Sequence, residues 1–86
     1  MTKTTFENLK KVLTSDHVYA AGVYYSLSLC EVIYDDFEYR RITVYSNRPD
    51  GSFHDGFARF FCEVANVLGC ACSFRSEHGV CVCKFY

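Results

Sequence analysis

A helical pattern of hydrophobic residues opens the chain. Its apolar positions follow one another at helical spacing: Phe6, Leu9 and Leu13. This spacing places them on one side of a helix, as a single narrow stripe. Thr4 and Glu7 match a capping box, in which each side chain accepts a hydrogen bond from a free backbone N–H at the helix start. The sequence therefore predicts a helix over about residues 5–14 that packs by one face on a sheet.

The period of the pattern changes to two over residues 22–46. Alternation of apolar and polar side chains is typical of strands with one buried face. A turn at Asp35 and Asp36 would divide the segment into a hairpin and place Leu27 opposite Val44, which is a favourable apolar pair. Because Asp-Asp is a poor two-residue turn, a longer loop with the same centre is the alternative.

A second helix is expected after a turn-forming cluster at residues 47–51. Its apolar stripe is wide: Phe53, Phe57, Phe60, Phe61, Val64 and Leu68. Ser52 is the predicted N-cap, and Gly69 is the predicted residue after the last turn because glycine adopts positive φ at low cost. We expect a helix over about residues 53–68, although Gly56 in its first turn favours a later start.

Four cysteines occur in mirror order near the end of the chain: Cys70, Cys72, Cys81 and Cys83. If two strands pair around a turn at residues 76–77, Cys70 faces Cys83 and Cys72 faces Cys81. Side chains alternate between the faces of a strand, so all four thiols would then lie on one face.

Three interpretations of this thiol face are open. Four thiolates suit zinc, but zinc ligands normally come from cysteines two to four residues apart on tight turns. Disulfides directly across a hairpin are uncommon, and thiols stay reduced in the cytosol. The third interpretation is a buried face, because Phe74 and Phe85 share it and cysteine packs as a small hydrophobe. We favour the buried face, and we expect Cys62 in the core or at its boundary.

The expected fold class is α+β. The predicted elements follow one another in the order α-β-β-α-β-β, and their simplest packing is a four-stranded, mostly antiparallel sheet with two helices packed on one face. The chain has 86 residues, of which 50% are hydrophobic and 17% aromatic. A chain of this size supports one modest core, so residues 1–86 are expected to form a single domain.

Composition argues against several functional classes. A formal net charge of −1 provides neither the basic surface typical of nucleic-acid binding nor the acidity of a DNA mimic. No apolar run follows Met1 that would serve as a signal peptide or cross a bilayer, so we expect a cytoplasmic protein without a membrane partner. The sequence contains no glycine-rich phosphate loop, His-Glu-x-x-His motif or paired carboxylates. We therefore expect no enzyme and no cofactor.

The most informative surface is expected on the first hairpin. One of its faces would carry aromatic side chains around an arginine: Tyr24, Tyr34, Phe37, Tyr39, Arg41 and Tyr45. Tyrosine and arginine dominate the hot spots of protein interfaces. The same band is compatible with stacking of single-stranded nucleic acid, or with tyrosines that only cover an open sheet. We favour binding of a protein partner, and we do not expect binding of nucleic acid.

At the level of a class, the chain resembles the compact single-domain inhibitors encoded by phages and mobile elements, which include anti-CRISPR proteins. The resemblance rests on short length, one α+β domain, the absence of catalytic motifs and the tyrosine-rich face. It implies blockade of a host nuclease or effector complex by surface binding, although the acidity of the DNA-mimicking members is missing here. The expected function is thus a non-enzymatic protein-binding inhibitor, with a homodimer as a further expected state. The alternative is a small zinc- or nucleic-acid-binding module built on the four hairpin cysteines.

Overall fold

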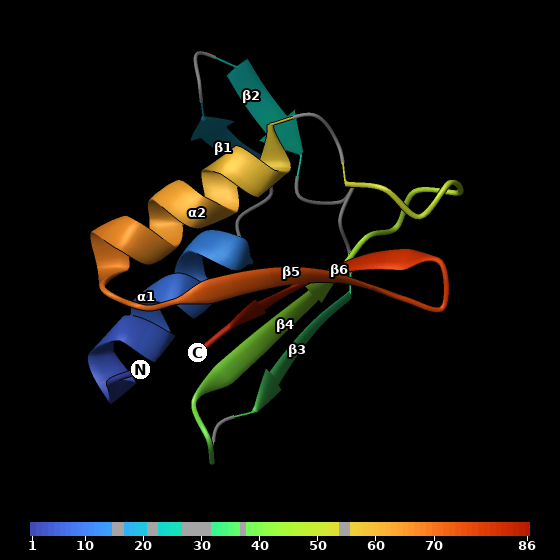
Figure 1. The fold of residues 1–86 in the computed structure, drawn as a ribbon. Helices are drawn as coiled ribbons and strands as arrows, with labels where there is room; N and C mark the ends of the chain where they lie inside the picture. The colour runs from blue at the N-terminus through green and yellow to red at the C-terminus, as the bar shows by residue number, and fades with distance from the viewer. Residues whose placement is uncertain (15–16, 21–22, 27–31, 37, 54–55) are drawn as a thin grey trace.

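A computed structural model of the protein describes residues 1–14, 17–20, 23–26, 32–36, 38–53 and 56–86, with side chains for residues 1–14, 38–53 and 56–86. In chain order the elements are α1 (Lys3–Leu13), β1 (His17–Ala20), β2 (Val23–Ser26), β3 (Val32–Asp36), β4 (Arg41–Tyr45), α2 (Phe57–Leu68), β5 (Cys72–Glu77) and β6 (Val80–Phe85). Figure 1 shows both helices on the same side of the main sheet.

Two helices and a three-stranded antiparallel sheet, in the order α1-β4-α2-β5-β6, form the α+β framework, with β6 between β4 and β5. Strand β3 pairs with the outer edge of β4, whereas β1 and β2 pair with each other in a separate two-stranded sheet. The predicted α+β class is confirmed. The predicted chain order with four strands in all, α-β-β-α-β-β, is wrong, because the segment before β4 divides into three short strands and two of these, β1 and β2, pair outside the main sheet.

Helix α1 packs by the predicted stripe, whose members are all buried: Phe6, Leu9 and Leu13. It begins earlier than predicted, because Thr2 rather than Thr4 is the N-cap and accepts a hydrogen bond from the Thr5 N–H at 3.1 Å. The Thr5 hydroxyl in turn donates to the carbonyl of Leu68 at 3.0 Å. The start of α1 is thereby joined to the end of α2.

Helix α2 begins at Phe57, later than the predicted N-cap at Ser52, because Gly56 takes a left-handed conformation with φ 91°. Its predicted end is confirmed. Gly69 is left-handed with φ 79°, and its N–H donates to the carbonyl of Ala65 at 2.9 Å. Of the helices in the described residues, none is long and apolar enough to cross a membrane.

The turn of the cysteine hairpin lies at His78 and Gly79, two residues later than predicted. Both residues have positive φ, 53° and 79°, as a two-residue type I′ turn requires. Cys72 therefore lies opposite Phe85, and the predicted pairing of Cys72 with Cys81 is wrong. Each residue's partner changes by four positions, and an even change keeps every side chain on its predicted face.

The hairpin of β3 and β4 also has a different register from the predicted one. The predicted turn at residues 35–36 is the end of β3, and the loop follows it, with Arg40 left-handed at φ 52°. Val44 lies opposite Ile33. The predicted partner of Val44 was Leu27, which lies outside the described residues. The predicted and the observed registers each give Val44 an apolar partner, so the side-chain pattern alone does not distinguish them.

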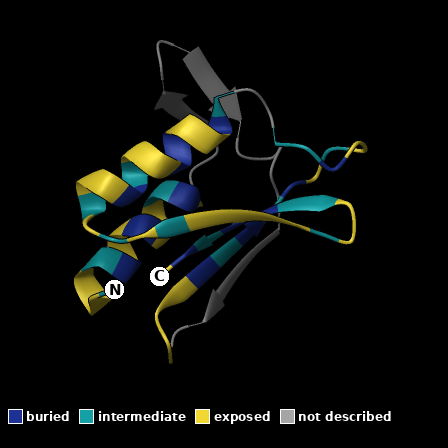
Figure 2. Ribbon diagram, viewed as in Figure 1, coloured by how far each residue is buried: buried dark blue, intermediate teal, exposed yellow. Residues whose placement is uncertain are grey.

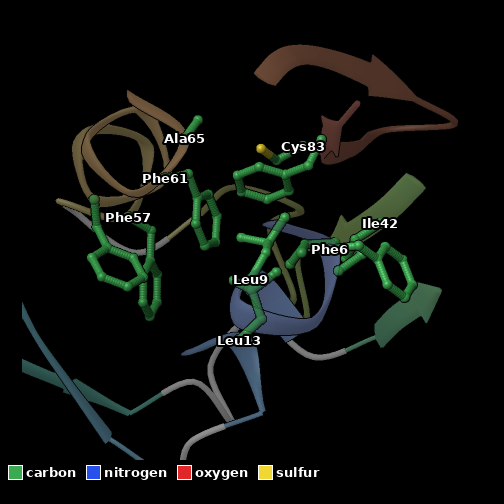
Figure 3. Close-up of a cluster of buried hydrophobic side chains, with 11 residues drawn as sticks. Phe6, Leu9, Leu13, Ile42, Phe57, Phe61, Ala65 and Cys83 are labelled. Atoms are coloured by element: carbon green, nitrogen blue, oxygen red, sulfur yellow. The ribbon is translucent and has the colours of Figure 1, made fainter. Parts of the chain in front are cut away.

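The hydrophobic core fills the space between the helices and the sheet (Figure 2). Its buried members come from both helices, β4 and β6: Phe6, Leu9, Leu13, Ile42, Val44, Phe57, Phe60, Phe61, Ala65, Cys83 and Phe85. Figure 3 shows side chains of α1 and α2 reaching into this shared space. Cys83 is fully buried, while Cys70 and Cys72 are partly buried and pack against the core. The interpretation of the thiol face as a buried face is confirmed for Cys83 and only in part for Cys70 and Cys72, and Phe74 of the same face is 40% exposed.

Candidate functional site

The side of the main sheet turned away from the helices carries the residues that alternate with those of the core, and we call it the outer face. Strand β4 alternates strictly, with Ile42 and Val44 buried in the core and the residues between them more exposed. The strand register brings matching positions of β5 and β6 to the same side. The members of the outer face on these three strands are Arg41, Thr43, Tyr45, Ser73, Arg75, Glu77, Val80, Val82 and Lys84, of which Val82 is fully buried.

Charge on the outer face is distributed unevenly. Glu77 forms ion pairs with Arg75 and with Lys84, the latter at 3.5 Å between Oε1 and Nζ. Partial burial opposes ionisation of Glu77, but Arg75 and then Lys84 outweigh it and hold the pKa of this carboxyl below its usual value. One acidic group is thus shared by two cations, which leaves local positive charge at the β5–β6 side of the face.

Arg41 marks the other side of the outer face. Its guanidinium lies over the ring of Tyr39, 5.1 Å from the ring centroid. A cation–π contact at an exposed site contributes about 0.5–1 kcal/mol, which favours one side-chain position. Asp36 of β3 lies directly opposite Arg41 in the strand register. Arg41 is therefore placed at the start of β4 by its contact with Tyr39.

A depression of about 350 Å³ lies between these two groups of charge. Its lining residues come from three strands and the last residue of the chain: Arg41, Thr43, Ser73, Lys84, Phe85 and Tyr86. The lining thus combines a guanidinium, an ammonium and three hydroxyl groups. Backbone hydrogen bonds of 2.9 and 3.0 Å between Ala71 and Tyr86 hold the end of the chain beside it. Such a set of donors suits a carboxylate or another oxyanion presented by a binding partner.

The predicted aromatic band is only partly assembled. Tyr39 is exposed in the turn before β4, and Tyr45 is half-buried on the outer face. Tyr34 occupies a register position on the same face, opposite Thr43. Tyr24, in contrast, lies on β2 opposite Tyr19 in the separate two-stranded sheet.

The expectation that one hairpin carries the whole band is therefore wrong, because β2 and β3 belong to different sheets. Phe37 lies outside the described residues. Arg41 and Tyr45 remain members of the candidate site, and Tyr39 is held against it through Arg41.

Sequence reasoning missed the contribution of the last hairpin to this surface. Ser73, Arg75 and Lys84 lie on the face opposite the thiols by alternation alone, but nothing in the sequence placed that face beside β4. The missing step was strand order, since β4 pairs with β6 and sets Thr43 next to Lys84.

The four hairpin cysteines do not form the two predicted cross-strand pairs, Cys70 with Cys83 and Cys72 with Cys81. Cys81 lies opposite Ser76, and Cys83 lies opposite Phe74. Among the residues that the structure describes, no group of three or more cysteine, histidine or acidic side chains is arranged to hold a metal ion. The zinc alternative in its predicted form, with Cys70, Cys72, Cys81 and Cys83 as ligands, depended on the register that is now corrected. Burial raises the pKa of the Cys70 thiol, which keeps it protonated.

Comparisons with protein-family models, curated proteins and solved structures found no match.

Proposed function

We propose that this protein is a non-catalytic protein-binding module that recognises an acidic segment of its partner with the outer face of its sheet. The observation that carries the proposal is the depression between Arg41 and Lys84, whose lining residues include two cationic and three hydroxyl-bearing side chains. An arginine held over a tyrosine ring is the kind of anchor that dominates protein interfaces. The form of this function that we put forward is blockade of a host nuclease or effector complex.

The surroundings of the depression support a protein partner. Tyr39, 62% exposed, and Tyr86, 53% exposed, flank it with large, rigid side chains that combine apolar area with a polar group. A carboxylate that enters the hollow would compete with Glu77 for Lys84, so binding would exchange one ion pair for another. Interfaces of this type associate faster at low salt, because opposite charges attract before contact.

Quantitative capture from bacterial lysate tests the proposal. Immobilised wild-type protein is compared with an Arg41→Ala/Lys84→Ala double variant and with a Lys3→Ala control, in which a lysine exposed on α1 is removed. We expect a defined partner to bind wild type and the control, to bind the double variant at least about 10-fold more weakly, and to dissociate at high salt.

Two results would contradict it. The first is that no protein binds above the level of blank resin. The second is that all three proteins capture the same partner with equal affinity. Sedimentation of the wild type separates a homodimer from a complex with another protein, and loss of a dimer in the double variant would identify the outer face as the dimer interface.

A further inference from the structure

Two cysteines meet where the end of α2 turns back into β5. The sulfur of Cys62, in the middle of α2, lies 3.8 Å from the sulfur of Cys72, the first residue of β5. The connection between them is short and well held. Gly69 and Cys70 both donate backbone hydrogen bonds to the carbonyl of Ala65, each at 2.9 Å. The two sulfurs therefore face each other because the backbone reverses tightly, rather than because flexible segments happen to meet.

We propose that Cys62 and Cys72 are a redox-active thiol pair, a modification site at which a low-molecular-weight disulfide such as oxidised glutathione closes a bond between α2 and β5. The sulfurs of a disulfide are about 2.05 Å apart, so side-chain rotation must shorten the present separation by roughly 1.8 Å. The pair lies outside the depression of the outer face, and this inference is independent of the proposed function.

The two thiols have different roles because their surroundings differ. Cys62 is exposed on α2, so an oxidant in solution can reach it. Cys72 is partly buried, and its thiol donates a hydrogen bond to the sulfur of Cys62. Burial, followed by the neighbouring Cys62, raises the pKa of Cys72 to about 11. Cys72 therefore holds its proton more strongly than an ordinary thiol, and the accessible Cys62 is the sulfur that attacks the oxidant first.

The chemistry balances as two successive exchanges. The Cys62 thiolate attacks one sulfur of oxidised glutathione, a bond forms between them, and one glutathione leaves as a thiolate. Cys72 then loses its proton to solvent and attacks the Cys62 sulfur, which releases the second glutathione thiolate. Two protein thiols are oxidised to one disulfide, and one glutathione disulfide is reduced to two glutathione molecules.

Cys83 is the main competitor for Cys72. It is fully buried on β6 and shares a side-chain hydrogen bond with Cys72. Because Cys83 is not accessible to an oxidant, a bond that starts at the exposed Cys62 is favoured. The resulting disulfide would join a helix to an edge strand across a short loop, which raises the melting temperature by several degrees.

The experiment is incubation of the reduced, full-length protein with oxidised glutathione, followed by alkylation of the remaining thiols. We expect the main product to carry four alkyl groups, where the fully reduced protein with its six cysteines carries six, and to contain a Cys62–Cys72 link. The link is located after cleavage at Glu63 or Leu68, both of which lie between the two cysteines. A Cys72→Ser variant should instead accumulate glutathione on Cys62, because the resolving thiol is missing. A Cys81→Ser control should form the link as the wild type does.

Other outcomes would overturn the proposal. These are a disulfide that joins Cys72 to Cys83 or to Cys70, stable glutathione on Cys62 in the wild type, or equal oxidation of wild type and Cys62→Ser. Circular dichroism of each reduced variant confirms that it is folded before it is compared. If Cys62→Ser is misfolded, Cys62→Ala provides the same test, because either change removes only the exposed sulfur.

Discussion

Single residues of this protein were best predicted where a side chain lies on a strictly periodic element. The buried stripe of α1 and the fully buried Cys83 and Phe85 were all expected from alternation and helical spacing. Two residues are exceptions. Phe74 was expected on the buried face of the last hairpin and is 40% exposed. Cys62 was expected in the core or at its boundary and is also exposed. Its position follows from the rotation of α2 about its axis, and packing against the sheet determines that rotation.

The protonation of Cys72 makes stability depend on alkaline pH. The ordinary pKa of this thiol is 9.0, and the folded state raises it to about 11. Between these two values the unfolded chain loses the proton and the folded protein keeps it, so the free energy of unfolding falls as the pH rises. We expect urea unfolding under reducing conditions to show a steeper loss for wild type than for Cys72→Ser from pH 9 to 11. Parallel pH profiles of the two proteins would contradict this assignment.

At the scale of elements, the turns determined which predictions failed. The residues that interrupt the hydrophobic pattern suggested turns at residues 35–36 and 76–77, whereas the observed turns use Arg40 and the His78-Gly79 pair with positive φ. The glycine at position 79 was a usable signal, because a type I′ turn needs positive φ at both central residues. Arg40 provided no such signal, since arginine has no preference for the left-handed region.

The loop after β4 is joined to β6 at Gly51. Its carbonyl accepts a hydrogen bond from the Cys81 N–H at 2.7 Å, and the Ser46 N–H donates to the Cys81 carbonyl at 3.0 Å. Gly51 has φ 77°, and an added Cβ would overlap the carbonyl oxygen of Gly79. This close approach explains why the loop needs glycine at a position that the sequence marked only as part of a turn.

We expect Gly51→Ala to destabilise the protein by roughly 3 kcal/mol or more, through backbone strain together with the overlap. Gly79→Ala is the matched control, because its φ of 79° is equally strained but an added Cβ meets open space. The control should cost only about 1–2 kcal/mol. Denaturant unfolding measures both, and equal losses would show that contact with the Gly79 carbonyl is unimportant.

At the scale of the whole molecule, one aromatic cluster holds the helices to the sheet. Phe61 is fully buried and lies 5.7 Å, centroid to centroid, from the ring of Phe85 and 5.6 Å from that of Phe57. Rings of Phe53 and Phe74 also approach it, at 5.5 and 6.4 Å. A single side chain thus contacts α2, the loop before it and two strands.

Truncation of Phe61 is therefore expected to weaken the entire fold. Phe61→Ala should lower the free energy of unfolding by about 3–5 kcal/mol, because it removes a buried ring and leaves a cavity. Val67→Ala on the exposed side of the same helix, where Val67 is 81% exposed, should change it by no more than about 0.5 kcal/mol. Urea unfolding at neutral pH with reductant compares them, and a similar loss in both variants would contradict the central role of Phe61.

The sequence by itself determined the α+β class, the two helices with their buried stripes, and which residues of β4, β5 and β6 share a face. These properties depend on local periodicity, because the spacing of residues along a helix or a strand already fixes which side chains share a face. Only the tertiary structure decided the strand order, the two hairpin registers, the position of Arg41 and Lys84 around one depression, and the approach of Cys62 to Cys72. These depend on contacts between distant segments. Because a change of register by an even number of residues keeps each side chain on its face, the hydrophobic pattern is equally satisfied by several pairings, and core packing with turn geometry selects among them.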